Sequence, residues 1–259
     1  MKNNINNEVV TIIKVVKKGK KYQVVSSVDE IECLEEQLVD DRIFKGKVFT
    51  LEEWEEVKKH QEVAYYFSKV INYLSYKLRT EKEIKDYLKE NNVSFEFSKQ
   101  IINKLYDYRL LDDTLYTKQY IETQIKNKKG PKAIEYNLRQ KGVGNKDLEL
   151  IYELYSITEQ KENIYLIIEK ELPKLKSFPI IKQKEKIKSK LLRNGFNEPH
   201  ITNTLNLFKL EADVLNRLEK DLNLLIRKKY PVVKIKQKLY QKGYSMSDIN
   251  QCLKNVIND

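Results

Sequence analysis

Few side chains in this chain of 259 residues could do chemistry, and the most suggestive pair is Asp112 and Asp113. Adjacent carboxylates could supply general acid–base catalysis, as in the helical-repeat DNA glycosylases, which combine a basic solenoid with an aspartate. Neighbouring residues of a helix do not face each other, however, and acidic residues at a helix start complement its dipole. We therefore expect Asp112 to cap a helix that begins near Asp113, and we keep catalysis as an alternative.

The other reactive residue types do not form clusters. His60 and His200 are the only histidines, neither has metal-ligand spacing, and no glycine-rich phosphate loop occurs. Cys33 and Cys252 are too few and too far apart for a disulfide framework or a zinc cluster, so we expect reduced thiols. The sequence predicts no catalytic residue, no metal, no cofactor and no small-molecule substrate.

The elements that must position these residues are indicated by one phrase that occurs four times. It consists of an apolar residue, Leu four residues later, and Gly or Asn four residues after that, followed at once by an apolar residue. The copies begin at Ile84, Ile134, Ile187 and Ile235, and their Gly or Asn residues are Asn92, Gly142, Gly195 and Gly243. Steps of four place Ile and Leu on one helical face, and Gly or Asn tolerates the left-handed residue that ends a helix. Apolar-periodic stretches before and after each phrase predict three helices per repeat.

The first sixty residues have a different pattern. β-rich runs over 9–16 and 22–25 flank the turn 17–21, which is typical of a hairpin, while 31–39 and 51–57 have the pattern of short helices. We predict a mainly all-α fold, in which tandem three-helix repeats form an elongated curved solenoid with a small N-terminal α+β module. The predicted boundaries are 1–60 for this module and 61–112, 113–158, 159–208 and 209–259 for the four repeats.

Capping signals support the helix starts. Thr50 with Glu53, and Thr80 with Glu83, have the Thr-x-x-Glu form in which two side chains satisfy helix-terminal N–H groups reciprocally. Pro131 follows Gly130 and is placed for the first turn of a helix, where a missing N–H does no harm. Each signal is worth about 1 kcal/mol.

Charge is concentrated in the later repeats. The formal net charge is +11, yet residues 1–115 are close to balance, while residues 161–210 carry 11 basic and 5 acidic groups and residues 211–259 carry 10 and 6. This excess favours a polyanionic partner, because Lys and Arg that neutralise phosphates release condensed counterions. A compositional bias toward Lys, Asn, Ile and Tyr is the competing explanation, under which most lysines are merely solvated. The 17 tyrosines could stack on single-stranded bases, but packing is their commoner use.

Targeting signals are not recognisable. No stretch approaches the roughly 20 apolar residues that span a bilayer, and the polar start lacks the apolar segment of a signal peptide. We expect a cytoplasmic protein without a membrane partner.

Three segments of the chain together resemble the RecX family of recombinase regulators. They are the run from Tyr73 to Ile84, the run Leu110-Leu111-Asp112-Asp113-Thr114-Leu115-Tyr116, and Lys128-Lys129-Gly130-Pro131 through Lys141-Gly142-Val143. Their order and spacing fit the family pattern, most clearly over 65–145. Thr117 stands where the family usually has Ala, and the third repeat lacks a Lys-Gly pair before its proline. The motif residues that we expect to act as scaffolding are Arg79, Thr80, Glu83, Leu111, Asp112, Asp113, Tyr116, Gly130, Pro131 and Gly142.

The resemblance implies a non-enzymatic regulator that binds RecA nucleoprotein filaments and inhibits strand exchange, ATP turnover and co-protease activity in DNA repair and the SOS response. A free-standing, sequence-nonspecific DNA- or RNA-binding protein remains an alternative, as does a helical-repeat DNA glycosylase. The candidate contacts to the RecA filament, or to single- or double-stranded DNA, are Lys126, Lys128, Lys129, Lys132, Arg139, Lys141, Lys182, Lys184, Lys186, Lys188, Lys190, Lys234, Lys236 and Lys238. A helix cannot show all five alternating lysines of 182–190 on one side, so only some of them can contact a partner.

Overall fold

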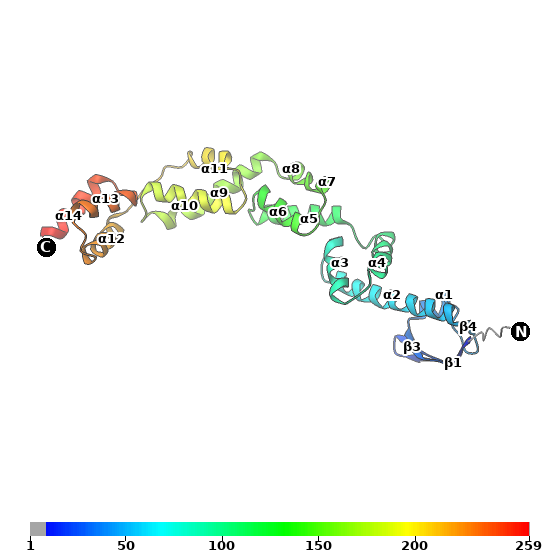
Figure 1. Cartoon of the computed structure of the whole chain (residues 1–259). Coiled ribbons are helices and arrows are strands. Elements are labelled where there is room, and N and C mark those ends of the chain that lie inside the picture. Colours follow the sequence, from blue (N-terminus) through cyan, green and yellow to red (C-terminus); the bar gives the residue numbers. More distant parts are fainter. Residues whose placement is uncertain (1–8, 259) are drawn as a thin grey trace, which may run out of the picture. The chain divides into compact units, whose positions relative to one another are not determined.

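The computed structural model describes residues 9–258, and its contacts divide the chain into two compact units, Met1–Tyr116 and Thr117–Asp259 (Figure 1). Helices dominate both, and the strands lie in the first. The predicted combination of three-helix repeats with a small N-terminal β module is therefore confirmed.

The first unit begins with a four-stranded antiparallel sheet of order β3-β2-β1-β4. The predicted hairpin is confirmed, since β1 (Val9–Lys18) pairs with β2 (Lys21–Ser26) around Gly19, whose φ is +63°. The remaining strands are β3 (Glu30–Cys33) and β4 (Val48–Thr50), and the short helix α1 (Glu35–Asp40) lies between them in sequence. The expected helix over 31–39 is thus wrong in its first half. Ile31 and Cys33 are buried and alternate with exposed glutamates, as a paired strand requires.

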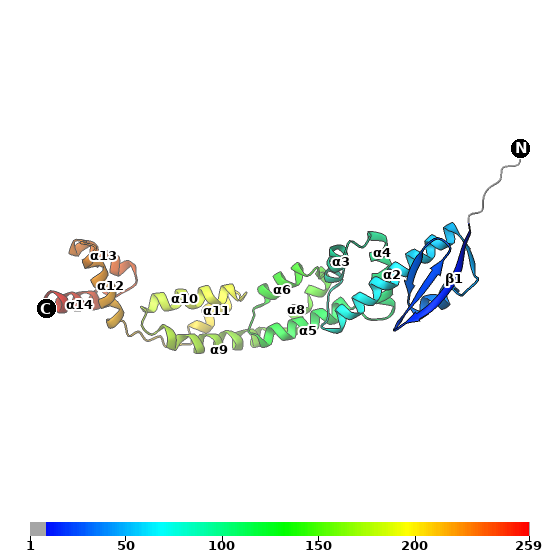
Figure 2. The same cartoon turned by 90° about the horizontal axis from the view of Figure 1, so that it is seen from below.

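Helix α2 (Leu51–Ser75) is a single helix of 25 residues, so the short helix expected over 51–57 is only its first part (Figure 2). The Thr50–Glu53 capping box starts it as predicted, and no Gly or Pro interrupts it. Trp54 and Val57 pack into the core of the sheet, whereas Val63 and Val70 pack with the next helices. The position expected for the domain boundary, residue 60, separates two hydrophobic cores but lies within one helix.

Helices α3 (Glu81–Glu90) and α4 (Phe95–Asp107) complete the first repeat with α2. Its core contains Ile84 and Leu88 from the repeated phrase, with Ile101 and Leu105 from α4, and all four are fully buried. Thr80 and Glu83 form the predicted capping box at the start of α3.

The second unit begins within α5 (Asp113–Lys126), whose first four residues belong to the first unit. Its further helices are α6 (Pro131–Gln140), α7 (Asn145–Leu148), α8 (Leu150–Leu154), α9 (Ile157–Leu175), α10 (Ile180–Arg193), α11 (Glu198–Leu205), α12 (Leu215–Arg227), α13 (Val232–Gln241) and α14 (Met246–Asn258). The third helix of the second repeat is divided into two short helices, α7 and α8, by a break at Glu149. Among residues 9–258, no helix has the combination of length and apolar character that a bilayer span requires.

All four repeated phrases end their helices in the predicted way. Asn92, Gly142, Gly195 and Gly243 have φ angles of 59°, 81°, 90° and 94°. In each case the N–H of the following apolar residue donates to the carbonyl of the phrase's Leu, at 3.0 to 3.3 Å, as in Val143 to Leu138. This bond satisfies a carbonyl that the helix leaves unpaired, and it directs the apolar residue back into the core.

The middle helices of successive repeats meet end to end in the second unit. The N–H of Gly130, at the start of α6, donates to the Asn194 carbonyl at 2.7 Å, and the N–H of Lys132 donates to the Gly195 carbonyl at 3.1 Å. A Cβ atom on Gly130 would lie 2.3 Å from the Gly195 carbonyl carbon. Glycine is therefore required for two backbones to touch, and the unpaired N–H groups of α6 are satisfied by the end of α10 (Figure 2).

Buried amides connect other elements of the second unit. Asn163 of α9 donates to the Ile125 carbonyl at 3.3 Å and to the Tyr155 hydroxyl at 3.0 Å, which ties α9 to α5 and α8. Gln183 of α10 donates to the carbonyls of Phe178 and Glu211, each at 2.8 Å. A buried amide without partners is costly, so these bonds fix the relative positions of the segments they join.

Candidate nucleic-acid interface

Asp112 and Asp113 serve two different helices. An Asp112 carboxylate oxygen accepts from the Leu115 N–H at 2.8 Å, which is the predicted cap of α5. An Asp113 carboxylate oxygen accepts instead from the N–H of Glu81, at 2.9 Å, in the first turn of α3. No local sequence pattern indicates this second bond, because 32 residues separate its partners.

The other motif residues also have structural contacts. The guanidinium carbon of Arg79 lies 4.0 Å from the centre of the Tyr73 ring, and Leu111 and Tyr116 are buried. Pro131 begins α6, and Gly142 is the left-handed residue that follows it. These contacts are what scaffolding requires, while the assignment of the whole set to scaffolding stays a prediction.

The candidate cations of the second repeat do not all lie together. Lys129 and Lys132 line a hollow of about 380 Å³, to which Arg193 of the third repeat also contributes. Lys126 is exposed at the end of α5, and Lys128 follows it with a left-handed φ of 56°. Arg139 is held by Glu135, at 2.9 Å, and by Asn145, at 2.8 Å, and Lys141 caps the end of α6. Of the six candidate cations of the second repeat, only Lys129 and Lys132 line this hollow.

The five alternating lysines of α10 separate into two groups. Lys182, Lys186 and Lys190 are four residues apart and line one groove, whereas Lys184 and Lys188 lie outside it. Lys188 is 3.8 Å from Glu198. A period of 3.6 residues per turn places every fourth residue on one face, which is the reason for this division.

In the fourth repeat two of the three candidate lysines lie near an aromatic ring. The ammonium groups of Lys234 and Lys238 lie 5.2 and 5.0 Å from the centre of the Tyr230 ring. The groove described next includes none of these three lysines.

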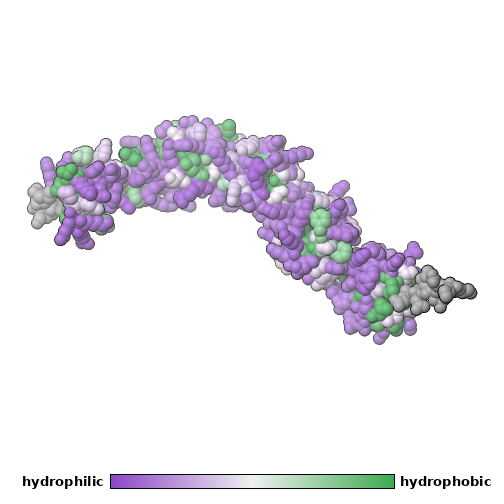
Figure 3. Space-filling view, in the orientation of Figure 1, coloured by the Kyte–Doolittle hydropathy of each residue, from purple (hydrophilic) through white to green (hydrophobic). Residues whose placement is uncertain are grey.

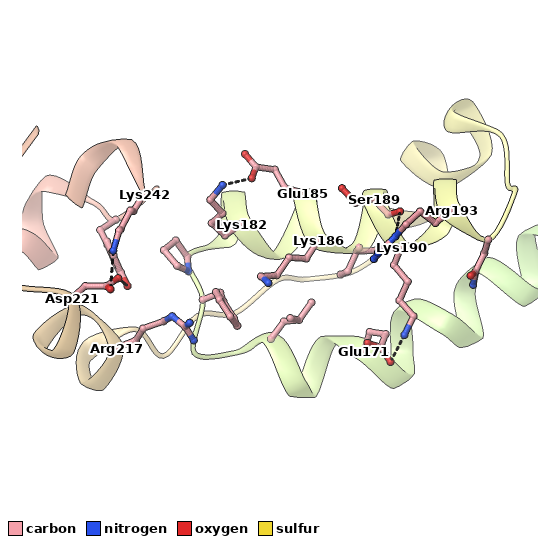
Figure 4. Close-up of a pocket in the computed structure, with 16 residues that line it drawn as sticks. Glu171, Lys182, Glu185, Lys186, Ser189, Lys190, Arg193, Arg217, Asp221 and Lys242 are labelled. Atoms are coloured by element: carbon pink, nitrogen blue, oxygen red, sulfur yellow. Dashed lines mark hydrogen bonds and ion pairs between the residues drawn. The ribbon is translucent and has the colours of Figure 1, made fainter. Parts of the chain in front are cut away.

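A groove of about 880 Å³ lies between α9, α10, α12 and the end of α13 (Figure 4). Its basic residues are Lys182, Lys186, Lys190, Arg193, Arg217 and Lys242, and its acidic residues are Glu171, Glu185 and Asp221. The sequence pattern did not indicate Arg193, Arg217 or Lys242. The i, i+7 spacing of Lys186 and Arg193 on one helix could have indicated Arg193, but no local signal connects α10 with Arg217.

Lysines already neutralise the carboxylates of this groove. Glu171 accepts from Lys190 at 2.9 Å and from Lys174 at 2.6 Å, Lys182 pairs with Glu185, and Asp221 accepts from Lys242 at 2.8 Å. The lysine bonds hold the pKa of Glu171 below its usual range. Burial, together with the bond to Asp221, raises the pKa of the Tyr244 hydroxyl, which therefore remains a donor.

The visible face of both units is mainly hydrophilic, with small and separate hydrophobic areas (Figure 3). Residues 9–258 contain no group of three or more His, Cys, Asp or Glu placed to hold a metal ion. Both cysteines are free thiols in buried positions, and burial raises the pKa of Cys33 to about 12. Grooves lined by cations are the prominent chemical feature of the second unit.

The fold and this surface define a class, the proteins built from tandem three-helix repeats with basic grooves along their middle helices. Family models narrow the class. The model for the first RecX three-helix domain matches residues 67–105, and the model for the second matches residues 112–149. The chain is 30% identical over 253 residues to the regulatory protein RecX of Enterococcus faecalis, which covers 93% of this chain and 95% of that relative. The chain therefore belongs to the RecX family of regulatory proteins.

Further relatives agree with this assignment. The regulatory protein RecX of Streptococcus pyogenes serotype M4 is 30% identical over 259 residues, covering 95% of this chain and 99% of the relative. A crystal structure of a regulatory protein RecX matches with a TM-score of 0.65 at 27% identity, over 75% of this chain and 99% of the other. The crystal structure of RecX from Lactobacillus salivarius matches with a TM-score of 0.52 at 32% identity, and the match covers 56% of this chain and 94% of the other.

Proposed function

We propose that this protein is a non-enzymatic regulator that binds RecA nucleoprotein filaments in the cytoplasm and inhibits their strand exchange, ATP turnover and co-protease activity. The observation that carries the proposal is membership of the RecX family over nearly the whole chain, repeats and N-terminal module together. The cation-lined grooves of the second unit support it, because a filament presents both DNA phosphates and acidic protein surface.

The positions of Asp112 and Asp113 count against the glycosylase alternative. A general acid or base must be free to reach its substrate, whereas these carboxylates accept hydrogen bonds from the backbone of two helices. We expect Asp112→Asn and Asp113→Asn proteins to release no fewer damaged bases than the unaltered protein, because the proposed regulator does not remove bases.

The proposal is tested by adding the purified protein to RecA filaments preformed on single-stranded DNA and following ATP hydrolysis. A parallel titration measures binding to the same DNA without RecA, in the same buffer. We expect inhibition at protein concentrations at least about tenfold below those that bind naked DNA. DNA binding with no effect on the filament would favour the second candidate, a free-standing nucleic-acid-binding protein.

A further inference from the structure

The groove of the second unit contains three cations that no carboxylate neutralises. Its acidic residues Glu171, Glu185 and Asp221 are all engaged by lysines. Within residues 9–258, Lys186, Arg193 and Arg217 have no acidic side chain within ion-pairing distance. Arg193 instead donates to the Ser189 carbonyl at 3.3 Å, and Arg217 donates to the Ser177 hydroxyl at 3.5 Å. The groove thus has a positive charge that the protein itself leaves uncompensated.

Two of these cations meet at one aromatic ring. The Lys186 ammonium lies 4.5 Å from the centre of the Phe178 ring, and the Arg217 guanidinium carbon lies 3.6 Å from it. Figure 4 shows Lys186 and Arg217 reaching this place from α10 and α12. The ring attracts each cation, while the two cations repel each other. Positive charge is therefore concentrated beside this ring, and an anion that binds there would be attracted by both cations.

The segment that carries the ring is held in place by hydrogen bonds. Gln183, with 1% of its surface exposed, donates to the carbonyls of Phe178 and Glu211. The N–H of Asp213 donates to the Lys176 carbonyl at 2.8 Å. These bonds join the start of α10 to the segment that leads into α12, so the backbone that carries Lys186 and Arg217 is positioned before a ligand arrives. Pre-organisation of this kind reduces the entropy that binding must overcome.

The row of cations continues beyond this pair. Arg193 is seven residues from Lys186, which is about 10 Å along α10 or about three nucleotides of a stacked strand. Arg193 also lines the neighbouring hollow, where it joins Lys129 and Lys132. A row that extends over two repeats fits a polymer with regularly spaced charges better than the irregular charges of an acidic peptide.

We infer that the groove between α9, α10, α12 and α13 binds the phosphodiester backbone of a single nucleic-acid strand, with Lys186 and Arg217 holding one phosphate and Arg193 another. Contact to phosphates alone carries no base preference, so the binding is independent of sequence. The inference deepens the proposed function and rests on it for its setting, since DNA is the component of the filament that this groove would contact.

The test compares two double variants of the full chain. Lys186→Gln with Arg217→Gln removes the paired cations, and the matched control Lys220→Gln with Arg227→Gln removes the same residue types from exposed positions of α12 outside the groove. Binding to a fluorescent single-stranded oligonucleotide is titrated without RecA at several salt concentrations, and melting curves check folding. We expect the groove variant to bind about tenfold more weakly and its salt slope to fall by about 1.4, and the control to change by less than about twofold.

An equal loss of DNA affinity in both variants would overturn the inference, because charge anywhere on the surface would then have the same effect. No loss in either variant would overturn it too, because the groove cations would then not contribute to binding. A filament ATPase assay with the same proteins separates the two proposals. If the groove variant binds DNA normally but no longer inhibits the filament, the groove takes acidic protein surface, and the inference fails while the proposed function stands. If the unaltered protein leaves the filament unaffected but shows the expected DNA losses, the inference stands and the proposed function fails.

Discussion

At the scale of single residues, Asp112 and Asp113 are adjacent in sequence but have different structural roles. Asp112 caps α5, which follows it directly, and Asp113 reaches back to the first turn of α3. A carboxylate near a helix N-terminus interacts favourably with the partial positive charge there. Both carboxylates are therefore engaged in hydrogen bonds that stabilise the fold.

Replacing Asp112 with Ala should lower the free energy of unfolding by about 1 kcal/mol, because the Leu115 N–H loses its acceptor. Urea denaturation measures this change. Inhibition of the filament, assayed well below the melting temperature, should be unaltered. A loss of inhibition with an unchanged unfolding curve would contradict the structural role.

Lys128 is strained by its own backbone, since its φ of 56° is one that side chains with a Cβ rarely adopt. Lys128→Gly should therefore raise the free energy of unfolding by about 1 kcal/mol. Lys118→Gly, within α5, is the control and should lower it by about 1 kcal/mol. Thermal or urea unfolding measures whether each change raises or lowers the free energy of unfolding. If both substitutions lower it, the Lys128 side chain itself stabilises the fold.

At the scale of elements, ion pairs and close backbone contacts decide how helices meet. Glu171 of α9 accepts from Lys190 of α10 as well as from Lys174, so it connects two helices of one repeat. The end-to-end contact of α6 and α10 connects two repeats. Each contact can be removed by one substitution.

Glu171→Gln should lower the free energy of unfolding at pH 7 by up to about 1 kcal/mol. The pKa of Glu171 is lowered in the folded state, so its contribution is present above the unfolded-state pKa of about 4.3 and is lost as the pH falls through the folded-state pKa. Urea denaturation from pH 7 to pH 3 should show the difference vanish in acid. Glu169→Gln, exposed on the same helix, is the control, and a difference that persists unchanged in acid would contradict the ion-pair origin.

Gly130→Ala should be much more destabilising than Gly144→Ala, although both glycines are helix N-caps with negative φ. A Cβ at Gly130 would lie 2.3 to 2.4 Å from backbone atoms of Gly195 and Phe196, whereas a Cβ at Gly144 would meet nothing within 4 Å. We expect a loss of about 2 kcal/mol or more for Gly130→Ala and a few tenths for Gly144→Ala, measured by urea denaturation. Equal losses would mean that the two backbones do not touch.

At the scale of the whole molecule, the hydrophobic cores are built from successive stretches of the chain. One core contains buried residues between Val10 and Val57, a second between Val63 and Leu111, and a third between Val214 and Leu253. Repeat proteins with separate cores have stabilities that approximate a sum of repeat and interface contributions. Local opening should then be possible without global unfolding.

Leu239→Ala should open the last repeat selectively. Leu239 is fully buried in the third of these cores, and its truncation should cost about 3 kcal/mol there. Hydrogen exchange should accelerate in 214–253 and remain slow in 63–111. Leu88→Ala is the matched variant in the second core and should produce the opposite pattern, so uniform acceleration by either variant would show that the chain unfolds as one cooperative unit.

The sequence by itself determined the features that depend on neighbours a few residues apart. The four left-handed helix stops, the Thr50 and Thr80 capping boxes and the β1–β2 hairpin all follow from local spacing. The helix stops and capping boxes close hydrogen bonds within about five residues, and the hairpin pairing starts at Lys18 and Lys21. The residue types that can form such local structures are few.

Tertiary structure decided what depends on residues far apart in the chain. Residues 31–33 form a strand because β2 offers an edge, and α2 runs through residue 60 because its two halves pack into two cores. Gly130 meets Gly195, and Lys186 meets Arg217 at Phe178, only after the repeats have stacked. A local pattern states which face of a helix is apolar, but which partner covers that face, and therefore which cations share a groove, is determined by the packing of the whole unit.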